Sequence, residues 1–171
     1  MHLRKSLNGA LAGAAAATVW AAQQPLDKRA FDYPYDDVEL LGKLITRGRA
    51  WPLAGLALHA VNGALFGAVY AQVRPFLPGP PLAGGVLAGQ VENFASWPLG
   101  SLVDRYHPVA KEIPPLRGTR ALAQATWRHL VFGLVLGELE RRLNEPGEAE
   151  PPEVPVSSNG HGDLEAALAT A

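Results

Sequence analysis

The sequence predicts an all-α membrane protein, a bundle of four transmembrane helices built from two parallel helix-hairpin repeats. Three observations support this prediction: four long apolar segments, a histidine and glycine pattern that occurs twice, and polar residues near the middle of the segments. Hydrophobic residues make up 48% of the chain and charged residues 18%, against about 25% charged residues in typical soluble domains. The net charge of −1 leaves no basic surface for nucleic acid. The chain has no cysteine, which excludes disulfides and thiolate sites.

The four apolar segments cover residues 7–22, 51–73, 82–103 and 121–139. A helix that crosses a bilayer needs about 20 apolar residues, so the first segment is short for a span. Its basic start, apolar middle and small residues also fit a secretory signal peptide, which is the alternative for this segment. In the third segment, Pro98 predicts a kink or break near Trp97, because proline lacks the amide hydrogen that an inner helical turn needs.

Two parts of the chain lie outside these segments. Residues 23–50 form a polar connection, in which Asp36 and Glu39 have the spacing of a helix N-cap with its capping box. Apolar residues then recur on one face over 38–45, which predicts a short helix lying along the membrane interface; the alternative is a surface helix on a soluble core. Residues 145–171 are acidic and rich in proline and glycine, which predicts a disordered tail after a membrane domain over 1–144.

An internal repeat relates the two halves of this membrane domain. His59, with glycines four and eight residues later, recurs as His129 with glycines at the same spacing, and the first and third segments share a glycine pair of the same kind. The repeats cover residues 9–74 and 85–144, with coincidence among glycine-rich helices as the alternative. Glycines four apart let another helix approach closely. The predicted helix-packing residues are Gly9, Gly13, Gly63, Gly67, Gly85, Gly89, Gly133 and Gly137.

Polar side chains inside the spans form the candidate site. Counting from the span ends places them at a similar depth, where ionisable groups face the bundle interior and pair. The members are His59, Asn62, Gln90, Glu92, Asn93, Arg128 and His129. In a structural role, Glu92 pairs with Arg128 or with a histidine and ties the helices together. In a functional role, the histidines and Glu92 carry protons or ions, or the two histidines hold a haem or, together with Glu92, a divalent metal.

With these motifs the chain resembles small multi-span bacterial inner-membrane proteins of uncharacterised function, the YagU-like group. The resemblance covers about 7–143 and rests on the Gly9 and Gly13 pair, on His59 with its two glycines, and on Tyr70. It implies a multi-pass protein of the bacterial inner membrane without an established activity, and it carries over no catalytic residue. The second copy departs from the pattern, with Glu140 at the position of the tyrosine.

The expected function is that of a non-enzymatic structural or accessory protein in the lipid bilayer. It would assemble through its glycine faces with a second copy or with another membrane protein. No nucleophile or paired-carboxylate arrangement indicates an enzyme, and no cofactor or metal site is assigned. A small proton- or ion-coupled transporter that uses the His/Glu cluster is the alternative, and a bis-histidine haem or metal protein is a further one. A soluble helical bundle with a partner groove is the third class.

Overall fold

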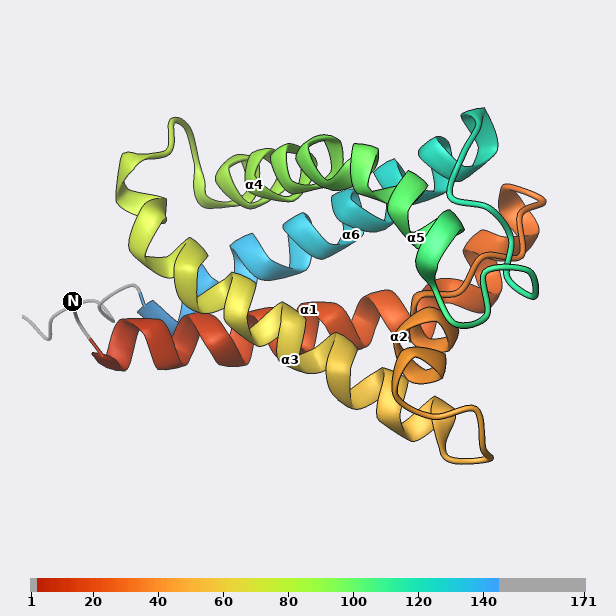
Figure 1. The fold of residues 1–171 in the computed structure, drawn as a ribbon. Helices are drawn as coiled ribbons and strands as arrows, with labels where there is room; N and C mark the ends of the chain where they lie inside the picture. Colours follow the sequence, from red (N-terminus) through yellow and green to blue (C-terminus); the bar gives the residue numbers. More distant parts are fainter. Residues whose placement is uncertain (1–2, 145–171) are drawn as a thin grey trace, which may run out of the picture.

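The computed structural model describes residues 3–144 of the chain (Figure 1). In chain order its elements are α1 (Leu3–Ala30), α2 (Asp37–Ile45), α3 (Trp51–Val73), η1 (Arg74–Phe76), α4 (Pro81–Ser96), η2 (Trp97–Leu99), α5 (Gly100–Tyr106) and α6 (Thr119–Asn144). No strand occurs in this range, so the predicted all-α class is confirmed for residues 3–144. The predicted tail, 145–171, lies outside the described residues.

The helices form two antiparallel hairpins that pack side by side. The first hairpin pairs α1 with α3, and the second pairs α4 with α6. The two hairpins meet where α1 lies against α6, and α2 covers one end of α3 (Figure 1). The order across the bundle is therefore α2, α3, α1, α6 and α4. The outer helices α3 and α4 belong to different hairpins, and both flank the central α1 and α6 pair.

Glycine contacts bring the helices of each hairpin close together. A Cβ atom built at Gly63 would lie 2.5 Å from the carbonyl oxygen of Gly13 and 2.6 Å from the Cβ of Ala17. In the second hairpin, a Cβ at Gly133 would lie 2.5 Å from the carbonyl oxygen of Gly85. All eight predicted glycines are buried, each against backbone of the neighbouring helix. The chain thus covers its own glycine faces, while the duplication of the two halves stays a prediction.

Two local expectations are confirmed. Asp36 caps α2 by accepting a hydrogen bond from the Glu39 amide at 3.0 Å. The third apolar segment breaks at Pro98, where a short 3-10 turn separates α4 from α5. The break follows from the missing amide hydrogen of proline and from the steric restriction that its ring places on the preceding residue.

One boundary differs from the expectation. The sequence predicts a polar connection from residue 23, but α1 continues through Pro25 to Ala30. An interior proline costs a helix one backbone hydrogen bond, which is why a proline in a sequence predicts a helix end. Here the last turns of α1 carry Gln24 and Asp27, which are buried against other parts of the chain. These tertiary contacts offset the local cost of the proline.

The number of membrane spans also differs from the expectation. Within the described residues, one helix, running from Trp51 to Phe76, is long and apolar enough to cross a membrane, with a mean hydropathy of 1.5. The other three predicted spans do not meet that criterion. α4 is only 16 residues long, and α1 and α6, which are long enough, are not apolar enough over any stretch of the required length. Length and composition therefore support one span and not four.

Candidate functional site

Arg128, on α6, lies in a buried ion-pair network between the two hairpins. Its Nε and Nη2 atoms donate to the two carboxylate oxygens of Asp27 at 2.7 and 2.6 Å, and its Nη1 donates to Asp37 at 2.6 Å. The side chains of Arg128 and Asp27 are 1% and 0% exposed. Such a two-pronged contact between planar groups is the strongest ion-pair geometry available to arginine. We call Asp27, Asp37 and Arg128 the buried clasp.

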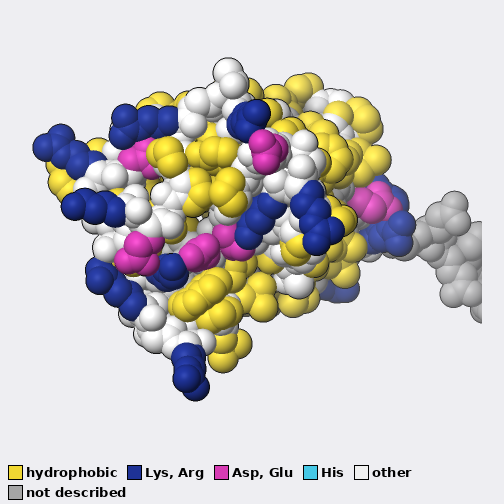
Figure 2. Space-filling model, turned by 90° about the vertical axis from the view of Figure 1, so that its right-hand side faces the viewer, with side chains coloured by type: hydrophobic (Ala, Val, Ile, Leu, Met, Phe, Trp, Pro, Cys, Tyr) yellow, Lys and Arg dark blue, Asp and Glu magenta, His cyan; other side chains and the backbone are white. Residues whose placement is uncertain are grey.

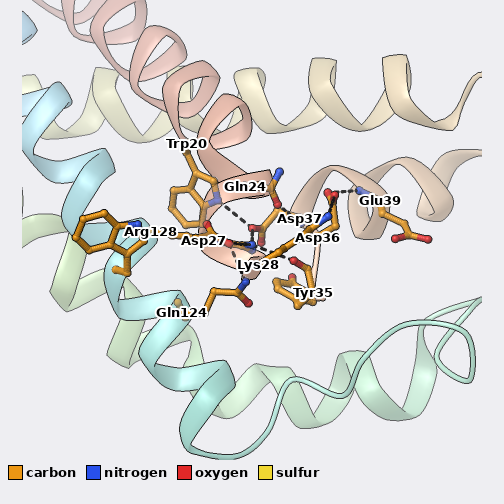
Figure 3. A network of polar contacts seen from close by, with 12 residues as sticks. Trp20, Gln24, Asp27, Lys28, Tyr35, Asp36, Asp37, Glu39, Gln124 and Arg128 are labelled. Carbon is orange, nitrogen blue, oxygen red and sulfur yellow. Dashed lines mark hydrogen bonds and ion pairs between the residues drawn. The ribbon is translucent and has the colours of Figure 1, made fainter. Parts of the chain in front are cut away.

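Neutral side chains complete the clasp (Figure 3). Gln124 donates to Asp27 at 2.7 Å, and the indole nitrogen of Trp20 donates to Asp37 at 2.9 Å. The backbone amide of Asp37 in turn donates to Gln24 at 2.9 Å. These bonds join the end of α1, the start of α2 and the middle of α6. A buried charge without partners would be costly, so this bonding lets the clasp hold three charged groups inside the protein.

The connection between α1 and α2 places one aromatic ring, that of Tyr35, beside the clasp. The Arg128 guanidinium lies 5.5 Å from the ring centre of Tyr35, whose carbonyl oxygen also accepts from Nη2. Burial and the neighbouring Asp37 carboxylate raise the pKa of Tyr35 well above its ordinary value, so its phenol stays neutral. Burial alone would raise the pKa of Asp36, but hydrogen bonds from Lys28 and from the Glu39 amide outweigh it and lower that pKa.

Next to the clasp, an open cavity of about 350 Å³ lies between the outer helices α3 and α4. Residues of α1 and α6 line its inner side, and residues of α2, η2, α5 and the connection before α6 close one end. Most of the lining is apolar or aromatic. The polar and charged residues that reach it are Asp37, His59, Asn62, Glu92, Asn93, Ser96, Arg128 and His129.

A histidine–carboxylate pair lies in the wall of this cavity. His129 Nε2 is 2.5 Å from Glu92 Oε2, and His129 Nδ1 is 2.7 Å from the carbonyl oxygen of Ala125. A carbonyl oxygen only accepts, so Nδ1 must carry a hydrogen. The contact with Glu92 then holds a single hydrogen, either as imidazolium with carboxylate or as imidazole with carboxylic acid. In both forms the pair has no net charge.

His59, on α3, completes the polar side of the cavity. It is only 8% exposed, and its Nε2 makes no hydrogen bond within residues 3–144. The indole of Trp20 meets both imidazoles edge-on, with ring centres 5.2 Å from His59 and 4.6 Å from His129. One aromatic ring therefore contacts both histidines that the sequence pattern singled out.

The predicted polar residues divide into three groups in space. His59, Glu92 and His129 meet at the cavity, and the exposed Asn62 lines the same cavity. Gln90 and Asn93 join the helices of the second hairpin, donating to the carbonyl oxygen and the hydroxyl of Thr126 at 3.0 and 3.2 Å, and Asn93 also reaches the cavity. Arg128 belongs to the clasp. Of the two partners expected for Glu92, the structure therefore shows a histidine and not Arg128.

Sequence reasoning missed four members of this region: Trp20, Asp27, Asp37 and Gln124. Asp27 falls within residues 23–50, which the sequence predicts to be a polar connection rather than part of a long helix. One available signal was the alignment of the two predicted repeats, in which Asp27 and Lys28 match Asp104 and Arg105. In both repeats the aspartate follows a tryptophan at the same distance. No pattern along the chain connects Asp27 with Arg128, because 101 residues separate them.

The geometry disfavours the haem and metal readings. Both ring nitrogens of His129 already have partners, so this side chain offers no free nitrogen as an axial ligand. Within residues 3–144, no group of three or more histidine, cysteine, aspartate or glutamate side chains could hold a metal ion. A haem or metal would require His129 to leave Glu92.

Comparisons with known proteins add no relative from which a role could be transferred. No protein-family model, no curated protein and no solved structure matches this chain. The resemblance to YagU-like membrane proteins thus rests on the sequence motifs alone and stays a prediction.

Proposed function

We propose that this chain is a non-enzymatic integral membrane protein of the bacterial inner membrane, with lipid around its long helices. The proposal rests on one observation: the bundle buries charged and amide side chains and exposes large apolar ones. We call this arrangement inverted polarity. The largest fully buried side chains are Arg128, Leu136, Gln124, Asn93 and Asp27. A water-soluble bundle buries leucine, isoleucine, valine and phenylalanine and leaves charged groups outside.

The outward faces of the helices supply the other half of this inversion. Large apolar side chains are exposed along α1, α3 and α4, and Leu65 and Val69 at the middle and end of α3 are 64% and 63% exposed. Soluble monomers rarely leave apolar patches of this extent uncovered. The exposed residues on these three helices are Leu3, Leu7, Leu11, Val19, Leu26, Leu53, Leu56, Val61, Leu65, Val69, Val73, Leu82, Leu87, Val91 and Phe94.

The burial of α3 separates two explanations for its apolar sequence. The core helix of a soluble protein is also long and apolar, but it is covered on most sides. In the most apolar part of the helix from Trp51 to Phe76, only 28% of the residues are buried inside the bundle. Lipid is the environment that accommodates the rest without cost.

Charges are sorted along the bundle in the manner expected of a membrane protein. Figure 2 looks onto the end formed by α2 and the polar connections, where lysine, arginine and acidic side chains gather. Arg47, for example, donates to the carbonyl oxygen of Pro108 at 2.6 Å across this end. Charged residues at a bundle end match the headgroup layer, in which α2 would lie.

We also propose that α1, α4 and α6 accompany α3 in the bilayer, giving four crossings. α1 has no charged residue between Ser6 and Leu26, and α6 has only Arg128 between Ala121 and Gly137. At about 1.5 Å per residue, the 28 residues of α1 and the 26 of α6 exceed a hydrocarbon core of about 30 Å. Arg128, the charged residue in this stretch, is paired with Asp27 and Asp37 inside the bundle, which lowers the cost of inserting it.

Assembly with a second copy or with another membrane protein would use a different surface from the one expected. All eight helix-packing glycines are buried between helices of this chain. The outer faces of α3 and α4 are free of such contacts within residues 3–144 and are the surfaces that a membrane partner would meet. An accessory role through these faces remains part of the proposal.

Fractionation tests the membrane proposal directly. Full-length protein, expressed in bacteria, should sediment with membranes, stay there in alkaline carbonate and enter solution in dodecyl maltoside. Alkaline carbonate releases peripheral proteins but not inserted ones. A folded, monodisperse chain in the aqueous supernatant after ultracentrifugation would exclude lipid as its solvent.

A second candidate function is proton- or ion-coupled transport through the cavity. The observation that favours it is the His129–Glu92 contact of 2.5 Å, in which two titratable groups hold one hydrogen at a cavity wall. Imidazole and carboxylate exchange protons readily, and such pairs form relays in pumps and transporters. His59, beside Trp20, is the next titratable group along the wall.

Proteoliposomes with an internal pH-sensitive dye test this candidate. An imposed proton gradient should collapse faster with wild-type protein than with empty vesicles. Glu92→Gln, which removes the proton acceptor without changing the shape of the side chain, should slow the flux at least about tenfold, the low end of what a positioned proton-transfer group contributes. His59→Ala should also slow it. Unchanged flux in both variants would remove the pathway.

A further inference from the structure

We infer that the cavity between α3 and α4 is a binding site for a small organic cation that carries an ammonium group. The inference does not depend on lipid around the bundle, because the cavity is formed by helices of one chain. It rests on three independent properties of the wall: its charge, its aromatic rings and its unpaired hydrogen-bond acceptors.

The charge of the wall favours a cation. Asp37 and Arg128 of the clasp line the cavity, and so do both members of the His129–Glu92 pair. Arg128 donates four hydrogen bonds, to Asp27, to Asp37 and to the Tyr35 carbonyl oxygen. Two negative carboxylates therefore share its one positive charge. The His129–Glu92 pair adds no net charge. The clasp therefore leaves the wall with one net negative charge, whose field is strong in a site partly shielded from water.

The aromatic rings favour an organic cation over a hydrated inorganic one. Five of them line the cavity: Trp20, Tyr35, Phe66, Trp97 and Phe132. Phe132 has ring centres of Phe66 and Trp20 at 5.5 and 6.1 Å, so three of the five rings pack together in T-shaped contacts. An ammonium group within about 6 Å of a ring face is attracted to its quadrupole, and the apolar body of the ligand packs on the same rings.

Two polar atoms of residues that line the cavity make no hydrogen bond within the described residues, one of them open and one buried. The second carboxylate oxygen of Glu92, Oε1, makes no hydrogen bond there, and neither does Nε2 of the buried His59. An ammonium group carries up to three hydrogens and can donate one of them to Glu92 Oε1 at the cavity wall. A buried nitrogen left without a partner costs stability, which a ligand would restore.

The volume limits the size of the ligand. At about 350 Å³ the cavity lies near the lower end of small-molecule sites, which span about 300–1,000 Å³. A single aromatic or short aliphatic body with one ammonium group fits this space, and we use benzylammonium as the probe.

Isothermal titration of the full-length protein in dodecyl maltoside tests the site. Benzylammonium should bind saturably with one site per chain. Benzyl alcohol and benzoate have nearly the same shape without the positive charge, and they should bind at least about tenfold more weakly. Equal affinity for the three probes, or no saturable binding of benzylammonium, would overturn the proposal. A failure of the chain to sediment with membranes would leave this result unaffected, so the two proposals fail separately.

Matched variants locate the site. Glu92→Gln should weaken benzylammonium at least about tenfold, whereas Glu138→Gln, which removes an acid of α6 outside the cavity lining, should leave the affinity unchanged. His59→Leu should weaken binding several-fold and His59→Gln, which retains an acceptor, should recover most of it. Circular dichroism and gel filtration confirm that each variant is folded. If both Glu92→Gln and His59→Leu bind as the wild type does, the cation does not occupy this cavity.

Discussion

At the residue scale, Arg128 is the side chain whose replacement should lower the free energy of unfolding most. It is buried, and it is the only positive charge that Asp27 and Asp37 contact within residues 3–144. Arg128→Met fills a similar volume but leaves Asp27 buried without a counter-charge. We expect it to lower the free energy of unfolding by about 3–5 kcal/mol, the usual cost of breaking a buried pair. Chemical denaturation in detergent, followed by circular dichroism, measures the loss.

Two further variants control this prediction. The double variant Asp27→Leu with Arg128→Met removes both charges of the pair and should be more stable than Arg128→Met alone. Arg120→Met removes an exposed partner of Asp32 and should change stability by less than about 1 kcal/mol. A loss at Arg128 no larger than that at Arg120 would show that water reaches the clasp.

A second residue-scale prediction concerns pH. Because the pKa of Asp36 is lowered in the folded state, its contribution to stability is complete above its unfolded value of 3.8. That contribution is lost as the pH falls through the folded pKa. Asp36→Asn retains the N-cap acceptor but does not titrate. The stability difference between wild type and Asp36→Asn should therefore shrink below pH 3.8, whereas a constant difference would mean that the carboxylate is not the stabilising form.

The sequence predicted single groups better than it predicted their partners. It identified His59, Glu92 and His129 because histidine and glutamate are conspicuous in apolar helices, and the structure brings these three to one cavity. It did not connect Arg128 with Asp27. Periodicity reports which face of its own helix a residue occupies, but the pairing of two helices is decided by how they dock.

At the element scale, the close approach of α1 and α3 makes Gly63 intolerant of any side chain. A Cβ there would meet the backbone of Gly13 and the side chain of Ala17, and a helix backbone cannot give way as a flexible side chain can. Gly63→Ala should separate the hairpin and lower the free energy of unfolding by about 1–3 kcal/mol or more.

Gly48→Ala is the matched control for this prediction. Gly48 lies in the connection before α3, where the nearest atom to an added Cβ is the Thr46 hydroxyl oxygen at 3.5 Å. Thermal melting in the same detergent should therefore show a large decrease for Gly63→Ala and little change for Gly48→Ala. Equal melting temperatures for Gly63→Ala and the wild type would mean that the hairpin is looser than its glycine contacts indicate.

Elements with a strong local signal were predicted correctly. The capping pattern at Asp36 fixed the start of α2, and Pro98 fixed the break after α4. Both depend on hydrogen bonds within a few residues, which a sequence displays directly. Pro25 carries a similar signal, yet α1 continues past it. The buried contacts of Asp27 outweigh the local preference there, and a sequence window contains no information on such contacts.

At the scale of the whole molecule, the membrane proposal gives glycine spacing and interior polarity one common explanation. Lipid provides no hydrophobic force between helices, so association in a membrane depends on close packing of small residues and on polar contacts. This molecule uses both: glycines join the helices within each hairpin, and the clasp joins one hairpin to the other. The sequence predicted the first device from residue spacing. The second depends on the docking of two hairpins, which no local pattern displays.

The identity of the solvent can be tested on the outer surface without disturbing either device. Leu65 is 64% exposed near the middle of α3, and Leu44 is 53% exposed on α2 at the bundle end. In water, an arginine at either position should change stability by no more than about 0.5 kcal/mol. In lipid, Leu65→Arg should cost about 2.5–3.5 kcal/mol because the charge lies in hydrocarbon. Leu44→Arg should cost far less, because its guanidinium reaches the headgroups.

Membrane-fraction yield and melting temperature in lipid bicelles should therefore fall for Leu65→Arg and remain near the wild type for Leu44→Arg. If the two variants behave alike and both are mild, the apolar outer faces do not contact lipid, and the inverted polarity of the bundle requires a protein partner to cover it.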